Sequence, residues 1–347
     1  MIYLGTTRPD ISDVADEWRD KLYAFLFDVR KTKVWVTDGR RRITKHDTYH
    51  EKMIKTAEYH ETKGGLASDE CQWVKKELEY FKTNFDKIVK AGETELKRQV
   101  TNYNRRAKRT TAKGRDEFKA LMVDLYERFT QSDSGGVVMS HYFFGVLNIK
   151  TCPYCNRQYT FTLDEKEAKA APEYDHFYDK SDYPQIAVSF YNLVPSCHVC
   201  NHVKGNKKTV KVNPFFRGFE SKFYLYNKKD KTKRLNALEI LSQVDGNLEL
   251  KKADESESGA DKGNIKAFGL KSLYAMHDDY VKEIIEKAVA YDKTARQLIA
   301  DTFQKRGYLP DQVFDFVWGR YLDDAQYENR PLSKLTKDLL EQLGIRK

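Results

Sequence analysis

The chain has 347 residues, of which 40% are hydrophobic and 13% aromatic, so it is too apolar for an intrinsically disordered protein and long enough for two or three domains. Its formal net charge of +9 favours an anionic partner without indicating a fold. There is no apolar run of about eighteen residues and no basic-then-apolar N-terminal leader, so we expect neither a membrane span nor secretion.

Residues 1–136 are expected to form a helical N-terminal region. Apolar residues recur at helical spacing over 13–29 and again over 118–129, which predicts two helices that face a core. A short strand and turn are expected at 33–40, and one long polar helix at 69–108. Three histidines lie between these two elements: His46, His50 and His60. Their neighbours are Lys and Glu, with no cysteine, which favours a solvated helix face over a metal site.

The densest basic run of the chain follows the long predicted helix. It contains Arg105, Arg106, Lys108 and Arg109. These side chains are candidates for contacts with nucleic-acid phosphates, and the alternative is a charged helix end with no ligand.

Four of the five cysteines fall in two Cys-x-x-Cys pairs, Cys152/Cys155 and Cys197/Cys200. Two such pairs can present four thiolates to one tetrahedral ion, so the spacing predicts a structural Zn²⁺ site; a pair of redox dithiols is the alternative. Reduced cysteines arranged in this way fit a cytoplasmic protein.

Chemistry-bearing residues lie between and directly after these pairs. They are Asp175-His176, Asn192 and Asn201-His202, followed by a basic end with Lys204, Lys207 and Lys208. The order of the cysteine pairs, the Asp-His pair, the Asn and the basic end resembles the HNH endonuclease family over about sixty residues. The resemblance implies an α+β fold, with a zinc-stapled ββα-metal core at 137–216 between mainly helical flanks at 1–136 and 217–347.

The resemblance also implies a role for each of these residues in hydrolysing a phosphodiester bond of DNA. His176 would be the general base, since an imidazole can take a proton from water near neutral pH. Asn192 would orient the loop that carries His176. Asp175 and Asn201 would hold a catalytic Mg²⁺ or Mn²⁺, with His202 as the alternative to Asn201, because only one of two consecutive helical residues faces the ion. Lys204, Lys207 and Lys208 would contact phosphates, or would form a solvated helix end.

The C-terminal region is expected to begin with a hairpin that turns at 245–247, to continue with an exposed acidic loop at 253–263, and to end in helices. Its sequence RPLSKLTKDLL and the NPF at 213–215 are similar to flanks of HNH proteins of bacterial phage-defence systems, of the Septu and retron-linked types. That likeness implies a role in antiviral defence with a regulatory ATPase as partner protein. RNA stays an alternative substrate. A second interpretation is a zinc-stabilised binding protein without activity. Cleavage of both DNA strands would require a homo-oligomer or two successive events.

Overall fold

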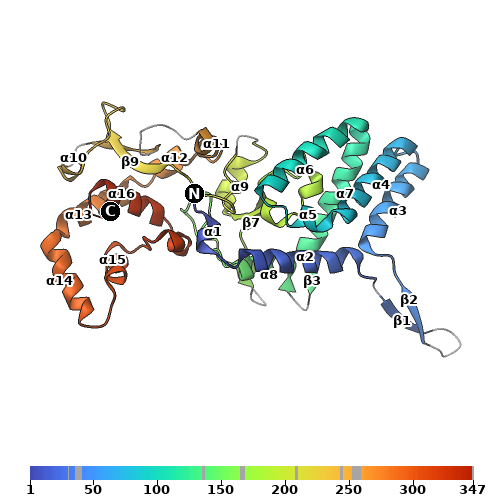
Figure 1. Ribbon diagram of the computed structural model, residues 1–347, viewed down its shortest axis with the longest axis horizontal. Coiled ribbons are helices and arrows are strands. Elements are labelled where there is room, and N and C mark those ends of the chain that lie inside the picture. Colours follow the sequence, from blue (N-terminus) through green and yellow to red (C-terminus); the bar gives the residue numbers. More distant parts are fainter. Residues whose placement is uncertain are drawn as a thin grey trace.

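The computed structural model describes residues 1–29, 31–35, 41–134, 137–164, 169–207, 210–242, 245–251 and 259–345. Within these ranges the protein is α+β and mostly helical, and every sheet has two antiparallel strands. The molecule is elongated: α3, α4 and α7 lie at one end, α13, α14 and α15 at the other, and α1, α9 and β7 lie between them (Figure 1). No helix in the described ranges is both long and apolar enough to cross a lipid bilayer.

The N-terminal half consists of helices that bury their apolar sides. These are α1 (Leu4–Thr7), α2 (Ile11–Phe27), α3 (Tyr49–Thr62), α4 (Ser68–Thr83), α5 (Phe85–Val89), α6 (Glu93–Arg106), α7 (Ala112–Gln131) and α8 (Met139–Leu147). The prediction of one helix over 69–108 is wrong, because the chain is interrupted twice. The Asn84 amide donates to the carbonyl of Tyr80 at 2.9 Å where α4 ends, and Gly92 is extended where α6 begins.

The solvated-face interpretation of the three histidines is wrong for His50. Its side chain is 3% exposed and its Nε2 lies 3.2 Å from the Leu78 carbonyl, so it joins α3 to α4 inside the core. Burial lowers the pKa of His50, which keeps the imidazole neutral. His60 lies on the surface of the same helix and donates from Nδ1 to Glu117 at 2.8 Å.

The strands pair locally along the chain. The pairs are β1 (Lys31–Trp35) with β2 (Arg41–Lys45), β3 (Asp133–Ser134) with β4 (Val137–Val138), β5 (Leu163–Asp164) with β6 (Lys169–Ala170), β7 (Glu173–His176) with β8 (Leu193–Ser196), and β9 (Lys222–Asn227) with β10 (Gly246–Lys251). The expected strand at 33–40 is present as β1, and residues 36–40 lie outside the described ranges. The expected hairpin turn at 245–247 is wrong, because Gly246 already belongs to β10 opposite Asn227 and the connection contains α10 (Ala237–Leu241).

The remaining helices cover the cysteine segment and form the C-terminal end. They are α9 (His198–Lys204), α11 (Gly259–Ala267), α12 (Leu270–Ala275), α13 (Asp278–Ala290), α14 (Lys293–Gln304), α15 (Pro310–Trp318) and α16 (Ser333–Gln342). Residues 259–263 therefore belong to a helix and not to the expected acidic loop, whose residues 253–258 lie outside the described ranges.

Trp18 on α2 connects the N-terminal helices to the middle of the chain. It is 1% exposed, and its ring meets the edges of Phe129 at 4.9 Å and Phe143 at 4.7 Å between ring centroids. Its Nε1 donates to the Val188 carbonyl at 2.9 Å, so the indole is both packed and hydrogen-bonded. The segment between β7 and β8 is thus fixed to the helical end of the molecule.

Asn156, in the first cysteine turn, connects the cysteine segment to the C-terminal region. Its carbonyl accepts from Leu332 N at 2.5 Å, and its side-chain amide donates to the carbonyls of Tyr327 at 3.0 Å and Arg330 at 3.2 Å. Its Oδ1 accepts from Lys334 N at 3.2 Å. Asn156 is fully buried at φ +48°, a left-handed conformation that Asn tolerates better than most residues. We call this set of contacts the Asn156 junction.

Candidate metal centre and the adjoining strand–helix unit

The four cysteines of the two pairs converge in the folded chain. Their sulfur atoms all lie within 4.8 Å of one another, and the Sγ atoms of Cys155 and Cys197 are 4.0 Å apart. All four are buried and none forms a disulfide. Sulfurs bound to one tetrahedral zinc at about 2.3 Å lie roughly 3.8 Å from each other, so the cluster can hold a zinc ion.

Local backbone geometry positions the cysteines of each pair. In the first pair, Cys152 N donates to the Gln158 carbonyl at 2.9 Å, which closes the turn, and Arg157 N points at the Cys155 sulfur at 3.4 Å. In the second pair, Cys197 is the residue that precedes α9 and Cys200 follows within its first turn. Backbone N–H groups near both pairs favour thiolate sulfur.

The electrostatics of the cluster also favour metal binding. Hydrogen bonds from the thiols of Cys152, Cys155 and Cys200 lower the pKa of the Cys197 thiol. Burial raises the pKa of Cys152 instead, because a thiolate there would lack a counter-charge. A divalent cation supplies that charge for all four sulfurs, which is the condition under which a thiol deprotonates in an apolar site.

Strand β7 carries its side chains alternately to two faces. Glu173 and Asp175 face α9, whereas His176 lies against Tyr126 of α7, with 4.6 Å between the ring centroids. Strand β8 pairs with β7 over its whole length, with Asp175 opposite Val194. The chain then passes through Cys197 directly into α9, so the order is strand, strand, helix.

Asp175 is enclosed in the protein. Its side chain is 3% exposed, its Oδ1 accepts from Lys204 Nζ at 2.7 Å, and its Oδ2 accepts from the Tyr154 hydroxyl at 2.7 Å. Burial raises the pKa of Asp175, and the ammonium of Lys204 opposes that rise. Both carboxylate oxygens are therefore already engaged by protein groups, and Lys204, itself 2% exposed, is not available to a phosphate.

His176 is held as a neutral imidazole. Its Nε2 lies 3.0 Å from the carbonyl oxygen of Ala187, an acceptor, so Nε2 carries the proton and Nδ1 carries the lone pair. Burial lowers its pKa to about 3, and the nearby Lys180 ammonium acts in the same direction. The base form is thus present across the neutral range.

Asn192 ties down the loop that follows His176. Its Oδ1 accepts from Tyr178 N at 2.8 Å, and its Nδ2 donates to the carbonyls of Tyr178 and Ile186, both at 3.1 Å. The side chain is fully buried and all of these partners are backbone groups. Asn192 therefore fixes backbone geometry on both sides of the His176 ring and is not exposed to a substrate.

Sequence reasoning did not single out Glu173, which is the centre of a polar cluster at the start of α9. Glu173 Oε1 accepts from His198 Nδ1 at 2.7 Å and Oε2 accepts from Asn201 Nδ2 at 2.6 Å. The His202 ring is nearly parallel to that of His198, with 5.7 Å between their centroids. Strand alternation was the available signal, since it places Glu173 on the same face as Asp175.

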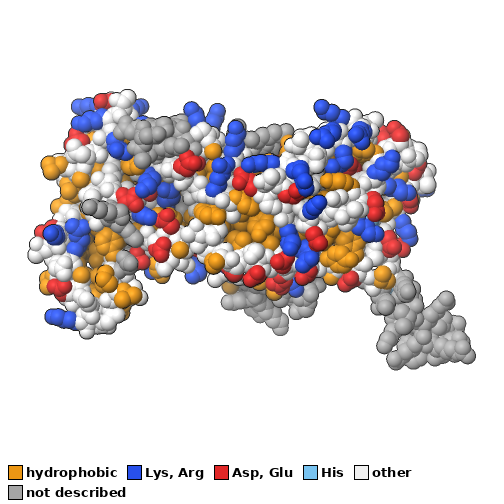
Figure 2. Space-filling view, viewed as in Figure 1, with side chains coloured by type: hydrophobic (Ala, Val, Ile, Leu, Met, Phe, Trp, Pro, Cys, Tyr) orange, Lys and Arg blue, Asp and Glu red, His pale blue; other side chains and the backbone are white. Residues whose placement is uncertain are grey.

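The predicted phosphate-binding residues are placed differently from one another. Arg105, Lys108, Arg109 and Lys207 are exposed, and Lys208 lies outside the described residues. Arg106 is directed inward: its Nε donates to the buried Glu77 at 2.7 Å and its guanidinium covers Tyr80 at 3.9 Å. On the face shown in Figure 2, Lys and Arg are interspersed with Asp and Glu.

A hollow of about 330 Å³ connects the basic run with the loop after His176. It is lined by Lys108, Arg115 and Lys119 with Asp116, the ion-pair partner of Lys119 at 3.0 Å, and by Ser181 and Asp182. Three cationic side chains thus face the segment that begins six residues after β7's Asp175. This is the part of the described surface where the basic run and the candidate site meet.

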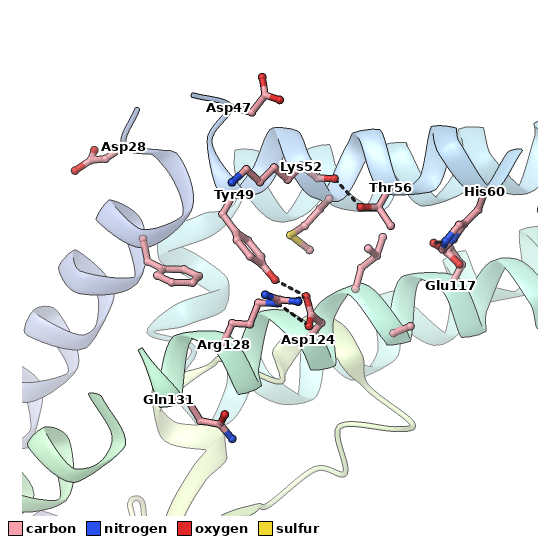
Figure 3. Close-up of a pocket in the computed structure, with 14 residues that line it drawn as sticks. Asp28, Asp47, Tyr49, Lys52, Thr56, His60, Glu117, Asp124, Arg128 and Gln131 are labelled. Carbon is pink, nitrogen blue, oxygen red and sulfur yellow. Dashed lines mark hydrogen bonds and ion pairs between the residues drawn. The ribbon is translucent and has the colours of Figure 1, made fainter. Parts of the chain in front are cut away.

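A second cavity, of about 790 Å³, lies between α3 and α7 and contains none of the predicted site residues (Figure 3). Several polar side chains that line it are hydrogen-bonded to one another. The Tyr49 hydroxyl donates to Asp124 at 2.6 Å, Arg128 Nε donates to both oxygens of Asp124 at 2.8 Å, and His60 pairs with Glu117. These pairs join the two helices.

The chain is similar over 66 residues to the Septu protein PtuB of Bacillus thuringiensis, with 42% identity. The match covers 18% of this chain and 23% of that protein, so it spans about a quarter of the relative's length. No protein-family model matches the chain, and no solved structure matches it. The likeness is therefore regional.

Proposed function

We propose that this protein is an HNH-type endonuclease that hydrolyses phosphodiester bonds of DNA. The observation that carries the proposal is the state of His176, a neutral imidazole with its Nδ1 lone pair uncommitted. It ends β7, and Asn192 fixes the loop that follows through three hydrogen bonds to backbone groups. The strand–strand–helix order around it, with a cysteine cluster at the helix start, supports the ββα reading of this region.

In the proposed reaction, His176 Nδ1 accepts a proton from a water molecule as the water oxygen attacks phosphorus. A P–O bond forms to the water oxygen, the opposite P–O bond breaks, and the departing oxygen is protonated by solvent. The Ala187 carbonyl supports this step, because its hydrogen bond to Nε2–H stabilises the imidazolium that forms. Its low pKa keeps His176 unprotonated at neutral pH and also makes it a weaker base than an imidazole with a pKa near 7.

Substrate binding in this proposal uses the cationic side of the hollow near Ser181. Lys108, Arg115 and Lys119 supply positive charge without reading bases, which suits contact with the phosphate backbone. Lys207 adds an exposed cation at the end of α9. Lys204 and Arg106 drop out of the proposed contact set because both have buried acidic partners.

The divalent cation that the HNH resemblance implies at Asp175 and Asn201 does not fit this arrangement. Both oxygens of Asp175 accept hydrogen bonds inside the core, and the amide nitrogen of Asn201 is bound to Glu173. Asp175 thus offers no open oxygen to an ion, and the reaction steps above use only protein groups and water.

The partial likeness to the Septu protein PtuB supports a further part of the proposal, namely that the nuclease acts in anti-phage defence. In this proposal a partner ATPase, which the likeness of the flanks to phage-defence HNH proteins implies, controls it. Much of the chain lies outside the cysteine segment, and its helical ends offer room for such a partner.

The proposal is tested by incubating the zinc-loaded protein and added Mg²⁺ or Mn²⁺ with supercoiled plasmid and, separately, with single-stranded RNA. We expect relaxed or linear DNA with wild type and with the surface control His60→Ala, and none with His176→Ala, while all three retain zinc. Equal cleavage by His176→Ala would refute the assignment of the base. Cleavage of RNA alone would change the substrate, and binding without cleavage would favour a zinc-stabilised binding protein.

A further inference from the structure

Two stacked aromatic rings are exposed just after the first cysteine turn. Tyr159 is 49% exposed and Phe161 is 60% exposed, with 4.5 Å between their ring centroids and 19° between their planes. Leu163, the next residue in the same alternation, is 41% exposed. Single exposed apolar side chains are common on protein surfaces, whereas neighbouring ones that form a continuous surface mark a site of interaction.

The backbone that carries these rings is fixed. Thr160, between them, is 5% exposed, and its N–H donates to the Lys150 carbonyl at 2.9 Å while its hydroxyl donates to the Ile149 carbonyl at 2.6 Å. Tyr159 itself pairs with Thr151 in an antiparallel bridge. Because Thr160 points inward, the residues on either side of it point outward. Rings that are already held in place lose little conformational entropy when a ligand stacks on them.

Three cationic residues belong to the same neighbourhood. Lys150 lies opposite the ring-bearing segment, Arg157 precedes the first ring by two residues, and Arg330 belongs to the Asn156 junction. Their side chains donate to an amide oxygen, an imidazole nitrogen and a backbone carbonyl, at 3.0, 2.9 and 3.0 Å respectively. Within the described residues none of the three forms an ion pair. Glu328, a carboxyl group on which the charge of Lys150 acts, is 7% exposed, and burial raises its pKa to about 7.

Parallel rings beside cations that lack acidic partners fit an unpaired stretch of nucleic acid. Every base has a flat π face, so it can stack on an aromatic side chain whatever its sequence, and Lys and Arg neutralise the phosphates between the bases. A duplex stacks its base faces on one another and presents only base edges in its grooves. The exposed ring faces therefore favour a single strand over a duplex.

We propose that Tyr159 and Phe161 form a stacking platform for unpaired bases of single-stranded DNA, and that Lys150, Arg157 and Arg330 contact its phosphates. The inference rests on the proposed nuclease for its biological use, and it narrows the substrate class to DNA with unpaired nucleotides. The platform follows directly after the first cysteine pair, whose sulfurs converge with those at the start of α9. A strand bound there is thus held beside the cysteine cluster.

The test is fluorescence anisotropy of fluorescein-labelled oligothymidine and of a duplex of the same length, titrated with the zinc-loaded full-length chain. All proteins carry His176→Ala, so that binding is measured without cleavage. We expect the single strand to bind more tightly than the duplex, and Tyr159→Ala and Phe161→Ala each to weaken single-strand binding at least fivefold. Phe161→Trp, which keeps an aromatic ring, should bind as tightly as the parent. Tyr59→Ala is the matched control, because Tyr59 is a 58% exposed ring on α3, and it should bind like the parent.

Two further readouts separate stacking from charge. The fluorescence of 2-aminopurine within the strand should fall on binding to the parent and should fall less with Phe161→Ala, because stacking quenches it. Lys150→Gln should leave that quenching in place and should lower the slope of log affinity against log salt by about 0.7, the value for one phosphate contact on a single strand. Zinc content and circular dichroism verify that each variant is folded.

Equal affinity for single strand and duplex would overturn the proposal, as would unchanged binding by Tyr159→Ala and Phe161→Ala. Tighter binding of oligouridine than of oligothymidine would overturn the choice of DNA. Single-strand binding by a chain whose wild type cleaves no nucleic acid would uphold the platform and refute the nuclease. Plasmid cleavage by a chain that does not bind the single strand would refute the platform and leave the nuclease proposal standing.

Discussion

Lys204→Met is the substitution for which the structure predicts the largest effect on stability. The Lys204 ammonium lies 2.7 Å from Asp175 Oδ1 and 2.6 Å from the His176 carbonyl oxygen, and both charged side chains are almost completely buried. Methionine fills a similar volume but removes the positive charge, which leaves the carboxylate with only the Tyr154 hydroxyl. Removing one partner of a buried ion pair costs about 3–5 kcal/mol of unfolding free energy.

The pH dependence of that loss follows from the pKa of Asp175. Burial raises this pKa already in the wild-type protein, and removal of Lys204 raises it further because the opposing charge is gone. A carboxyl with a raised folded-state pKa binds its proton more tightly when folded, so its contribution to stability is full below the unfolded value and is lost as pH rises through the folded value. Lys204→Met should therefore be less destabilising at pH 5 than at pH 7.

Urea unfolding followed by tryptophan fluorescence, with zinc present, measures both effects. The double variant Asp175→Asn/Lys204→Met should recover most of the loss, because an uncharged pair avoids burying a lone charge. Lys76→Met, at an exposed lysine of α4, serves as control and should change stability by less than about 0.5 kcal/mol. Equal stability of Lys204→Met and wild type, or additive losses in the double variant, would refute the reasoning.

Three further outcomes are expected. Cys197→Ser should abolish zinc binding measured by atomic absorption and should expose the first cysteine turn to trypsin, whereas Cys71→Ser, at a buried cysteine outside the cluster, should keep one zinc per chain; retained zinc in Cys197→Ser would contradict this. Burial lowers the folded-state pKa of His176 to about 3, so below about pH 6.5 the unfolded imidazole protonates and the folded one does not. Wild type should therefore lose about 2 kcal/mol of unfolding free energy between pH 7 and pH 5. A His176→Gln variant with the same pH slope would show that this residue is not the cause. Asn156→Ala should destabilise the protein by about 2–4 kcal/mol and should release the 327–334 segment to limited proteolysis with zinc still bound, because it removes several buried hydrogen bonds, whereas protection equal to wild type would show that the Asn156 junction does not hold this segment.

Local chemistry made the metal centre predictable from the sequence. Two Cys-x-x-Cys turns are typical of a zinc site, so Cys152 and Cys197 could be paired without knowledge of the fold, and the convergence of all four sulfurs is confirmed. Helices with a clear apolar face, such as that over 118–129, were predictable for the same reason, since periodicity reports burial directly.

Contacts made through space were not predictable. The sequence alone does not indicate that Lys204 turns inward to Asp175 and not outward to solvent, because this depends on how α9 packs on β7. The burial of His50 depends in the same way on α4, and the break at Asn84 results from one side-chain hydrogen bond. Glu173 could have been found by carrying the strand alternation two residues back from Asp175.

Forming the Asn156 junction also carries an entropic cost when the chain folds. It joins positions that are 171 residues apart, between Asn156 and Tyr327, and so closes a long loop that contains the second cysteine pair and most of the C-terminal helices. The entropy of closing such a loop grows only with the logarithm of its length, and doubling the length costs about 0.6 kcal/mol. Segments such as the α14–α15 hairpin can therefore lengthen, shorten or be exchanged among relatives at little thermodynamic cost, while the junction beside the cysteine cluster stays in place.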